Sequence, residues 1–203
     1  MIEVEIKVSI TDEQKDALVD GAKFISQKFF TDEYFDSHDY KLTKNGLWLR
    51  KRNDKFELKL PATKSGNFNI NKNIPMYETT DKYEISDILN LDKKVSFIQA
   101  LELAGIKSFV KFDNIRTTYL KDNLKIDFDE ADFGDFKYNL CEIEVEVESK
   151  KQTEHALNKL YKFVSQFGIS TERAEGKIGY YIRVRRPAHY FAVKNSKKNV
   201  KEA

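Results

Sequence analysis

Cysteine is nearly absent from this sequence of 203 residues, in which Cys141 stands alone. An internal disulfide is therefore impossible, so we expect a reducing compartment, the cytoplasm. The sequence also lacks any apolar run of transmembrane length, and its first residues show no signal-peptide pattern. These absences predict a soluble cytoplasmic protein with no membrane partner.

An excess of charge of one sign is missing as well. The chain carries 35 basic and 33 acidic residues, a formal net charge of +2, although 33% of its residues are charged, above the usual quarter. A nearly balanced charge argues against binding to nucleic acid by bulk electrostatics, so we expect no nucleic-acid partner. High charge content with low net charge instead favours a site where both signs are needed locally.

What the chain does contain is enough apolar material for a substantial core, with 40% hydrophobic and 13% aromatic residues. We find no internal repeat and no linker that would divide it. The sequence therefore predicts a single domain over residues 1–193, followed by a polar tail over 194–203 that we expect to be disordered.

The N-terminal stretch, residues 2–8, alternates without interruption between apolar and ionisable side chains. Its apolar residues share one face of a strand, and Glu3, Glu5 and Lys7 share the other. A solvent-exposed face is ordinary in an antiparallel sheet, but a face made only of ionisable residues is not. The same pattern recurs in several later segments.

Spacing of apolar residues divides the rest of the chain into elements. We expect strands or hairpins over 29–36, 45–60 with a turn at Asn53-Asp54, 76–79, 106–120, 123–129 and 138–148. We expect helices near 12–23, 82–90, 94–104 and 151–167, a further segment at 177–184, and a terminal helix opened by Pro187. Residues 61–75 lack periodicity and are expected to form a loop.

The charged strand faces allow two arrangements, an open sheet with its charges in water or a closed barrel with its charges inside. Alternation alone favours the open sheet. Two features favour the barrel. These faces contain almost no Ser, Thr, Asn or Gln, which solvent-exposed faces usually contain. Side chains of like charge also stand two residues apart on one strand face, where they repel each other unless a cluster of opposite charge faces them. The charged positions are Glu3, Glu5, Lys7, Arg50, Arg52, Glu57, Lys59, Asp127, Asp129, Glu142, Glu144 and Glu146.

These clusters have a chemistry in common. Paired carboxylates, such as Glu142 and Glu144, ligate hard divalent cations such as Mg²⁺. Paired arginines, such as Arg50 and Arg52, bind phosphate oxygens with two-point geometry. Together they indicate a site for a polyphosphate bound with metal.

Several segments resemble one known family. They are Glu3-x-Glu5-x-Lys7, Leu47-Trp48-Leu49-Arg50-Lys51-Arg52, Glu57-Leu58-Lys59-Leu60-Pro61, the run 127–134, Glu142-Ile143-Glu144, Lys177 and Arg185-Arg186-Pro187. In this order they resemble the CYTH superfamily, the triphosphate tunnel metalloenzymes, and within it the thiamine triphosphatases. The resemblance covers about residues 2–190.

The resemblance implies an α+β fold, an eight-stranded antiparallel β-barrel with helices packed outside and a charged tunnel within. It implies that the triphosphate is held by Lys7, Arg50, Arg52, Lys59, Arg116 and Lys177, and the metal by Glu3, Glu5, Asp127, Glu142 and Glu144. Lys59, Glu78 and Arg116 would be the catalytic residues. The cofactor would be Mg²⁺, with Mn²⁺ as an alternative.

The activity implied is hydrolysis of thiamine triphosphate to thiamine diphosphate and phosphate by a monomer whose partner is a small-molecule triphosphate. An inorganic tripolyphosphatase is the alternative within the superfamily. A nucleotide cyclase or an RNA triphosphatase fits less well. From another class, a non-catalytic module that binds polyphosphate or nucleotide remains open.

The sequence departs from the family pattern in places. Tyr77-Glu78 lacks the usual spacer between Tyr and Glu, so Glu84 is an alternative to Glu78 as the acidic site residue. The stretch before Arg116 is longer than in the family, so Lys111 is a weaker alternative to Arg116 as the substrate-binding residue.

Other residues have two interpretations. Trp48 could pack in the core or stack on a cationic aromatic group such as thiamine, with Tyr34 as a second candidate. His38, His155 and His189 show no ligand spacing and are expected at the surface. Cys141 should pack outward, without a nucleophilic role.

Overall fold

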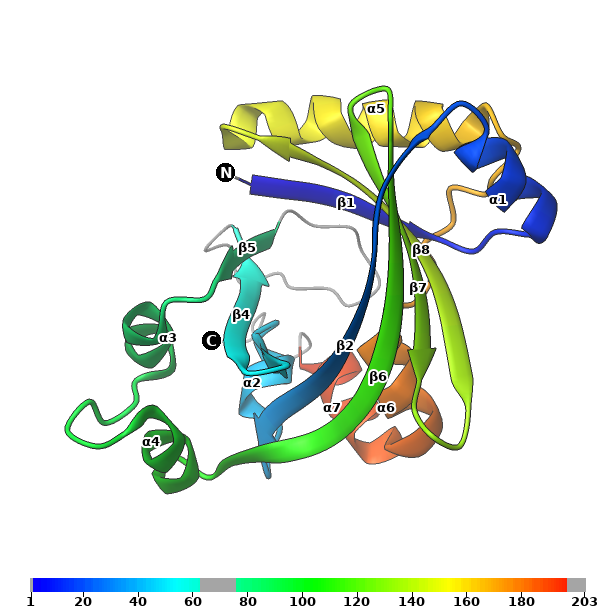
Figure 1. The fold of residues 1–203 in the computed structure, drawn as a ribbon. Helices are drawn as coiled ribbons and strands as arrows, with labels where there is room; N and C mark the ends of the chain where they lie inside the picture. The colour runs from blue at the N-terminus through cyan, green and yellow to red at the C-terminus, as the bar shows by residue number, and fades with distance from the viewer. Residues whose placement is uncertain (1, 63–75, 197–203) are drawn as a thin grey trace.

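The computed structural model describes residues 2–62 and 76–196 (Figure 1). Eight antiparallel strands close into a barrel in the order β1-β5-β4-β3-β2-β6-β7-β8, and helices pack around it. The strands are β1 (Ile2–Val8), β2 (Lys23–Ser37), β3 (Trp48–Arg52), β4 (Lys55–Pro61), β5 (Met76–Thr79), β6 (Ile106–Lys121), β7 (Leu124–Asp132) and β8 (Lys137–Val147). The expected α+β barrel is confirmed.

The helices are α1 (Asp12–Val19), α2 (Lys41–Lys44), α3 (Lys82–Leu89), α4 (Phe97–Leu103), the 3₁₀ turn η1 (Lys150–Gln152), α5 (Thr153–Ser165), α6 (Lys177–Arg185) and α7 (Pro187–Asn195). The expected helices are all present, the segment expected at 177–184 is also helical, and α2 and η1 were not expected. Thr11 and Gln14 cap α1 reciprocally, as their spacing predicted. No helix in the described parts of the chain has both the length and the apolar character needed to span a membrane.

The apolar strand faces point out of the barrel and are covered by the helices. One cluster lies under α5, where Ile6, Ile126 and Ile143 meet Leu160 and are fully buried. A second lies between β3, β4 and helices α3 and α4, and a third involves β6, α6 and α7. Burial of these side chains provides the main stabilisation of the fold and leaves the charged faces inside.

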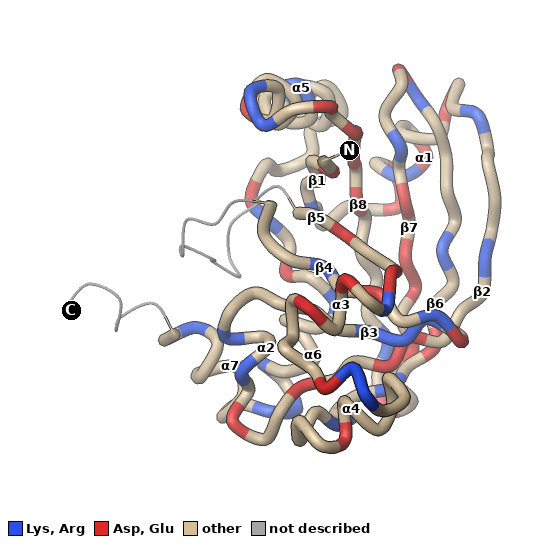
Figure 2. Tube along the Cα trace, turned by 90° about the vertical axis from the view of Figure 1, so that its left-hand side faces the viewer, with Lys and Arg blue, Asp and Glu red and all other residues tan. Residues whose placement is uncertain are grey.

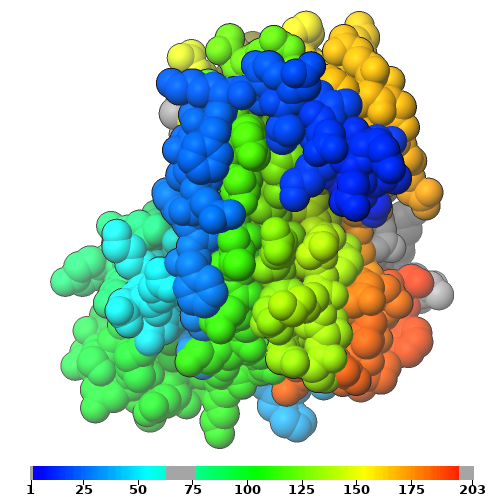
Figure 3. Space-filling view, turned by 45° about the vertical axis from the view of Figure 1, so that its right-hand side comes forward, coloured from blue at the N-terminus to red at the C-terminus, as the bar shows by residue number. Residues whose placement is uncertain are grey.

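One part of the barrel wall lies at the surface without a covering helix, and Phe29 on β2 is 66% exposed there (Figure 3). Figure 3 shows β2, β6 and β7 side by side, with α1 over their upper part and the C-terminal helices beside the lower part. β2 and β6 pair over nearly their whole length, from Lys23 opposite Leu120 to Ser37 opposite Ile106. This long pair forms one wall of the barrel.

Two element boundaries near the N-terminus were wrong. The helix expected over 12–23 ends at Val19, and the strand expected over 29–36 begins at Lys23. The apolar residues at 22 and 25 suggested helical spacing, but Ile25 is 47% exposed and lies in β2. Pairing with β6, including an edge-to-face contact between Phe24 and Tyr119, overrides the local pattern.

The C-terminal region corrects two further expectations. Lys194 lies in α7 rather than in a disordered tail, while residues 197–203 and most of the expected loop, 63–75, lie outside the described residues. His189, expected at the surface, is 1% exposed because α7 packs against α2, where its Nε2 lies 2.7 Å from Thr43 Oγ1. His38 and His155 are exposed, as expected.

Candidate functional site

The barrel encloses a cavity of about 300 Å³. Acidic and basic positions are distributed along its strands (Figure 2). Every site residue expected from the sequence lines this cavity except Asp127, so the charged faces do converge inside a barrel. The charged lining residues are Glu3, Glu5, Lys7, Arg50, Arg52, Lys59, Glu78, Arg116, Lys125, Glu142, Glu144, Arg173 and Lys177.

Three carboxylates meet on the β1–β8 side of the cavity. Glu5 stands opposite Glu144 in the antiparallel register, and Glu3 follows two residues away on the same face. One oxygen from each carboxylate lies within 4.8 Å of the others. Burial, together with the charges of Glu5 and Glu144, raises the pKa of Glu3 to about 7 despite the nearby Lys59. We call these residues the three-carboxylate cluster.

Two lysines bring positive charge close to these carboxylates. Lys59 Nζ on β4 lies 2.5 Å from Glu3 Oε1 and 3.2 Å from Glu5 Oε2. Lys7 also contacts Glu5 and lies 3.2 Å from Glu142. Burial opposes ionisation of Glu5, but the two ammonium groups outweigh it and lower its pKa to about 2.

Arg116 on β6 binds a different set of acids. Its Nε and Nη2 donate to the two oxygens of Asp129 at 2.7 and 2.6 Å, and further bonds of 2.7 Å reach Asp127 and Glu142. Burial disfavours a charged Glu142, but Lys177, Lys7 and Arg116 lower its pKa well below the ordinary value. Arg116 is thus fixed in one orientation.

The five carboxylates implied as metal ligands therefore do not all meet in this structure. Asp127 is fully buried and does not line the cavity, and Thr118 donates to it at 2.6 Å, while Glu142 is engaged by cations. Neither belongs to the three-carboxylate cluster. Sequence alternation could not reveal this, because neighbours on one strand face can meet different partners across the barrel.

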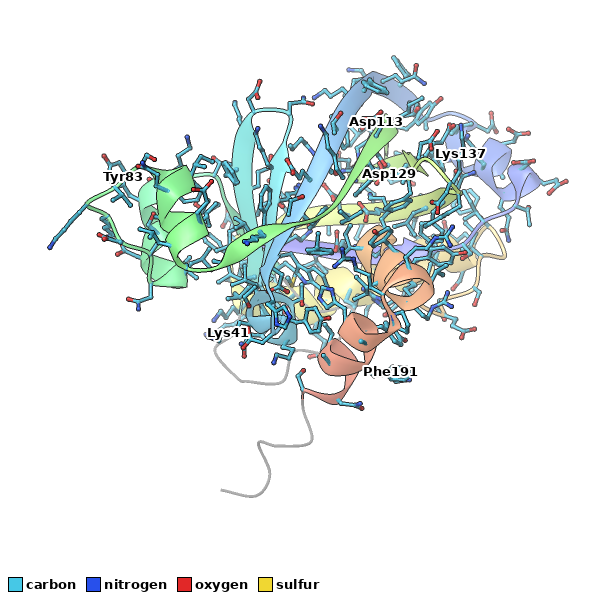
Figure 4. All side chains as sticks on the ribbon, turned by 90° about the horizontal axis from the view of Figure 1, so that it is seen from below. Lys41, Tyr83, Asp113, Asp129, Lys137 and Phe191 are labelled. Carbon is cyan, nitrogen blue, oxygen red and sulfur yellow. The ribbon has the colours of Figure 1, made fainter. Side chains whose placement is uncertain are left out.

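Lys177 enters the cavity from the first turn of α6. Its ammonium contacts Asp129, which is 1% exposed, so one carboxylate holds both Lys177 and Arg116. The segment before α6 runs along β1, with the Ala174 amide donating to the Lys7 carbonyl at 2.9 Å. Figure 4, seen from below, shows α6 in front of the strands on the side of the barrel where Asp129 lies.

Arg50 and Arg52 project from β3 and are each anchored by an acid that sequence reasoning left outside the site. Arg52 binds the buried Asp32 through two bonds of 2.8 Å. Arg50 donates to Glu57 at 2.6 Å and lies 3.5 Å from Glu78. The alternation did mark Glu57 as facing inward, whereas nothing local distinguished Asp32.

The structure separates the alternatives at two positions. Glu78 lines the cavity, whereas Glu84 accepts hydrogen bonds from Tyr77 at 3.0 Å and from Thr79 at 2.5 Å and does not line it. Arg116 likewise lines the cavity, while Lys111 is exposed and does not.

Apolar side chains form one part of the wall. Trp48 and Tyr34 line the cavity together with Met76 and Ile178. Trp48 also packs against the third apolar cluster, which contains Tyr34 and Ile178. Trp48 thus both contacts the core and lines the cavity. Cys141 faces the opposite way, under α5, and burial raises the pKa of its thiol, so it is no nucleophile.

Two basic lining residues were missed in the sequence. Lys125 stands two residues before Asp127 on the inward face of β7, so the alternation could have revealed it. Arg173 lies in an irregular segment before α6 and had no periodic signal.

Comparisons with known proteins connect this site to a family. The thiamine-triphosphatases of Macaca fascicularis and Homo sapiens are each 28% identical to the chain over 176 residues, 79% of this chain and 75% of theirs. A protein of Methanocaldococcus jannaschii named a putative adenylate cyclase is 26% identical over 178 residues, 85% of this chain and 93% of its own.

Solved structures share the fold. A protein of Pyrococcus horikoshii OT3 superposes with a TM-score of 0.63 at 20% identity, covering 91% of this chain and 99% of its own. A putative adenylyl cyclase from Hippeastrum, described as revealing a dominant triphosphatase activity, has a TM-score of 0.57 at 17% identity, covering 90% and 95%. The CYTH domain model matches residues 1–177, most of the sequence, and the chain therefore belongs to the CYTH domain family.

Proposed function

We propose that this protein hydrolyses the terminal phosphoanhydride bond of a small-molecule triphosphate in a metal-dependent reaction, and that the substrate is thiamine triphosphate. The observation that carries the proposal is the position of the three-carboxylate cluster within the same cavity as Arg50, Arg52 and Arg116. A triphosphate needs cations along its length, and its metal needs carboxylates beside it.

The three-carboxylate cluster fits a divalent cation. Its donors are all oxygens, which suit hard cations such as Mg²⁺ or Mn²⁺, and its negative charge is only partly offset by lysines. The raised pKa of Glu3 comes first from burial and then from the negative charges of Glu5 and Glu144. A divalent cation held by Glu3, Glu5 and Glu144 would supply Lewis-acid polarisation of the phosphate chain.

The cationic side chains bind and orient the substrate. Arg52, Arg116 and Lys177 are each paired with a buried acid that fixes their direction, so binding of phosphate requires little rearrangement. Lys59 pairs with Glu3 and Glu5 of the cluster and lines the cavity, so it would contact the substrate near the metal. Together these groups stabilise the charge that develops on the phosphate oxygens.

Glu78 is the residue we assign to the attacking water. It stands opposite Lys59 in the β4–β5 register and lines the cavity with its carboxylate. The water oxygen bonds to the terminal phosphorus as the bridging P–O bond breaks, Glu78 accepts the water proton, and phosphate and the diphosphate are released. No covalent intermediate with the protein is required.

Two observations support thiamine as the organic group of the substrate. Trp48 and Tyr34 offer an aromatic wall beside the cations, and two relatives are named thiamine-triphosphatases. Because Trp48 also packs against the third apolar cluster, inorganic tripolyphosphate is the second candidate. It would use the charged part of the cavity alone.

We further propose that one chain is a complete catalytic unit, a monomer working in the cytoplasm. Every charged group described above comes from a single chain, and a reducing compartment keeps the lone Cys141 a thiol. Size-exclusion chromatography with light scattering across a dilution series tests the monomer, because concentration-dependent activity and mass would contradict it.

A substrate panel tests the activity. Purified protein is supplied with thiamine triphosphate, tripolyphosphate or ATP, each with Mg²⁺, with Mn²⁺ or with EDTA, and phosphate release is followed. We expect metal-dependent hydrolysis with thiamine triphosphate preferred. A wide preference for tripolyphosphate favours the second candidate. Binding of these ligands without hydrolysis indicates a non-catalytic module.

A further inference from the structure

Lys125 is the one basic residue of β7 that lines the cavity, and nothing above assigns it a role. It stands opposite Glu144 in the β7–β8 register. Its ammonium lies 2.6 Å from Glu144 Oε1 and 3.0 Å from Asp127 Oδ2. One member of the three-carboxylate cluster is thus paired with a lysine from the neighbouring strand.

This lysine differs from the others that contact the cluster. The Lys125 side chain is 41% exposed, against 23% for Lys59 and 11% for Lys7. Each of the three lysines contacts two acids, so the exposure of its side chain is what distinguishes Lys125. Lys125 can therefore leave its carboxylate at the least cost.

A divalent cation and this ammonium compete for the same group. Both would approach the Glu144 carboxylate, and two positive charges a few ångströms apart repel strongly where water is partly excluded. After release from Glu144, Lys125 keeps only its 3.0 Å pair with Asp127, a carboxylate that it shares with Arg116 and Thr118. The remaining anion within reach would be a phosphate chain in the cavity.

We propose that Lys125 is a tethered counter-cation that occupies Glu144 in the metal-free protein and is displaced by the divalent metal, becoming a substrate-binding residue only in the metal-loaded state. This inference rests on the proposed function and adds an order to it, in which metal binding precedes tight triphosphate binding. Lys125 thereby weakens metal affinity and strengthens substrate affinity.

The first test uses Lys125→Met, which removes the charge and keeps most of the length. Mg²⁺ binding without substrate is measured by calorimetry on the full chain, after circular dichroism has confirmed its fold. We expect the Mg²⁺ dissociation constant to fall about three- to tenfold, since a competing charge is gone. Lys137→Met is the matched control, because Lys137 is 76% exposed and pairs with Asp132 outside the cavity.

A double variant tests whether Lys125 affects Mg²⁺ binding through Glu144. In a Glu144→Gln background, Lys125→Met should no longer tighten Mg²⁺ binding, because the contested carboxylate is absent. At saturating Mg²⁺, Lys125→Met alone should raise the KM for tripolyphosphate, while Lys125→Arg should restore it. Unchanged or weaker Mg²⁺ binding by Lys125→Met overturns the inference, as does an equal effect in both backgrounds.

The outcomes for the two proposals are separable. If the wild-type protein hydrolyses a triphosphate with metal and Lys125→Met fails to tighten Mg²⁺ binding, the inference is wrong and the proposed function stands. If the wild-type protein neither binds a divalent cation nor hydrolyses any triphosphate, the proposed function fails and the inference fails with it.

Discussion

The guanidinium of Arg52 makes two parallel hydrogen bonds with the buried carboxylate of Asp32, from Nε to Oδ1 and from Nη2 to Oδ2, each 2.8 Å long. The ring of Phe30 lies 3.8 Å from the guanidinium carbon. These contacts fix the plane of the arginine while it lines the cavity. Asp32 and Phe30 therefore hold the Arg52 guanidinium in one orientation at the cavity wall.

Replacing Arg52 by Lys keeps the charge and removes the planar fork. We expect weaker substrate binding and slower turnover, with kcat/KM reduced roughly tenfold or more if a contact worth about 1.4 kcal/mol is lost. Steady-state kinetics measure this, with Arg185→Lys as the control, since Arg185 is half-exposed and pairs with Asp135. Unchanged kinetics for the Arg52 variant would contradict its role in binding phosphate.

Glu144→Gln keeps the size of the side chain and removes its charge from the three-carboxylate cluster. We expect near-complete loss of Mg²⁺-dependent turnover with the fold intact, because one of the three anionic donors is gone. Metal-dependent phosphate release and circular dichroism are measured together. Glu146→Gln should behave as wild type, because Glu146 on the same strand is exposed. An active Glu144 variant with the ordinary metal requirement would refute this assignment.

Trp48→Ala tests the organic part of the substrate. Stacking and cation–π contacts with a thiazolium or pyrimidine are worth about 0.5–2 kcal/mol, roughly a threefold to thirtyfold preference in binding. The KM for thiamine triphosphate should therefore rise, while hydrolysis of tripolyphosphate should change little. An equal loss with both substrates would mean that Trp48 acts through its packing against the third apolar cluster.

Asp129 gives a prediction for stability against pH. Burial alone would raise the pKa of this carboxyl, but Lys177 and Arg116 outweigh it and lower the pKa to about 2. A depressed folded pKa contributes stability that is present above the unfolded value of about 4 and lost as pH falls toward 2. Asp129→Asn should thus lower the free energy of unfolding at pH 7 by at least about 2 kcal/mol.

Urea unfolding of both proteins at several pH values checks this prediction. The difference between wild type and Asp129→Asn should shrink between pH 4 and pH 2, as the wild-type carboxyl takes up its proton. Asp16→Asn, at an exposed position of α1, should show no such dependence. A difference that stays constant down to pH 2 would mean that Asp129 acts through packing and hydrogen bonding rather than through its charge.

Much of the site could be predicted because its residues lie on strands with strict alternation. In β1 and β8 the alternation identified Glu3, Glu5, Glu142 and Glu144 as inward-facing, and the cavity wall contains all four. Asp32 and Arg173 carried no such signal. Asp32 lies in a strand whose start was misplaced. Arg173 lies in a segment without periodicity, which contacts β1 through the hydrogen bond from the Ala174 amide to the Lys7 carbonyl.

Within each strand, the sequence by itself determined which side chains share a face, because the side-chain period of an extended chain is a property of the backbone. Only the tertiary structure decided which charges meet. Closure of the barrel places Lys59 beside Glu3 across 56 residues, and Lys177 beside Asp129 across 48. It also separates Glu142, held by Lys7 and Arg116, from Glu144, although both lie on one strand face. Electrostatic contacts depend on distance in space, and strand register around a closed barrel sets that distance.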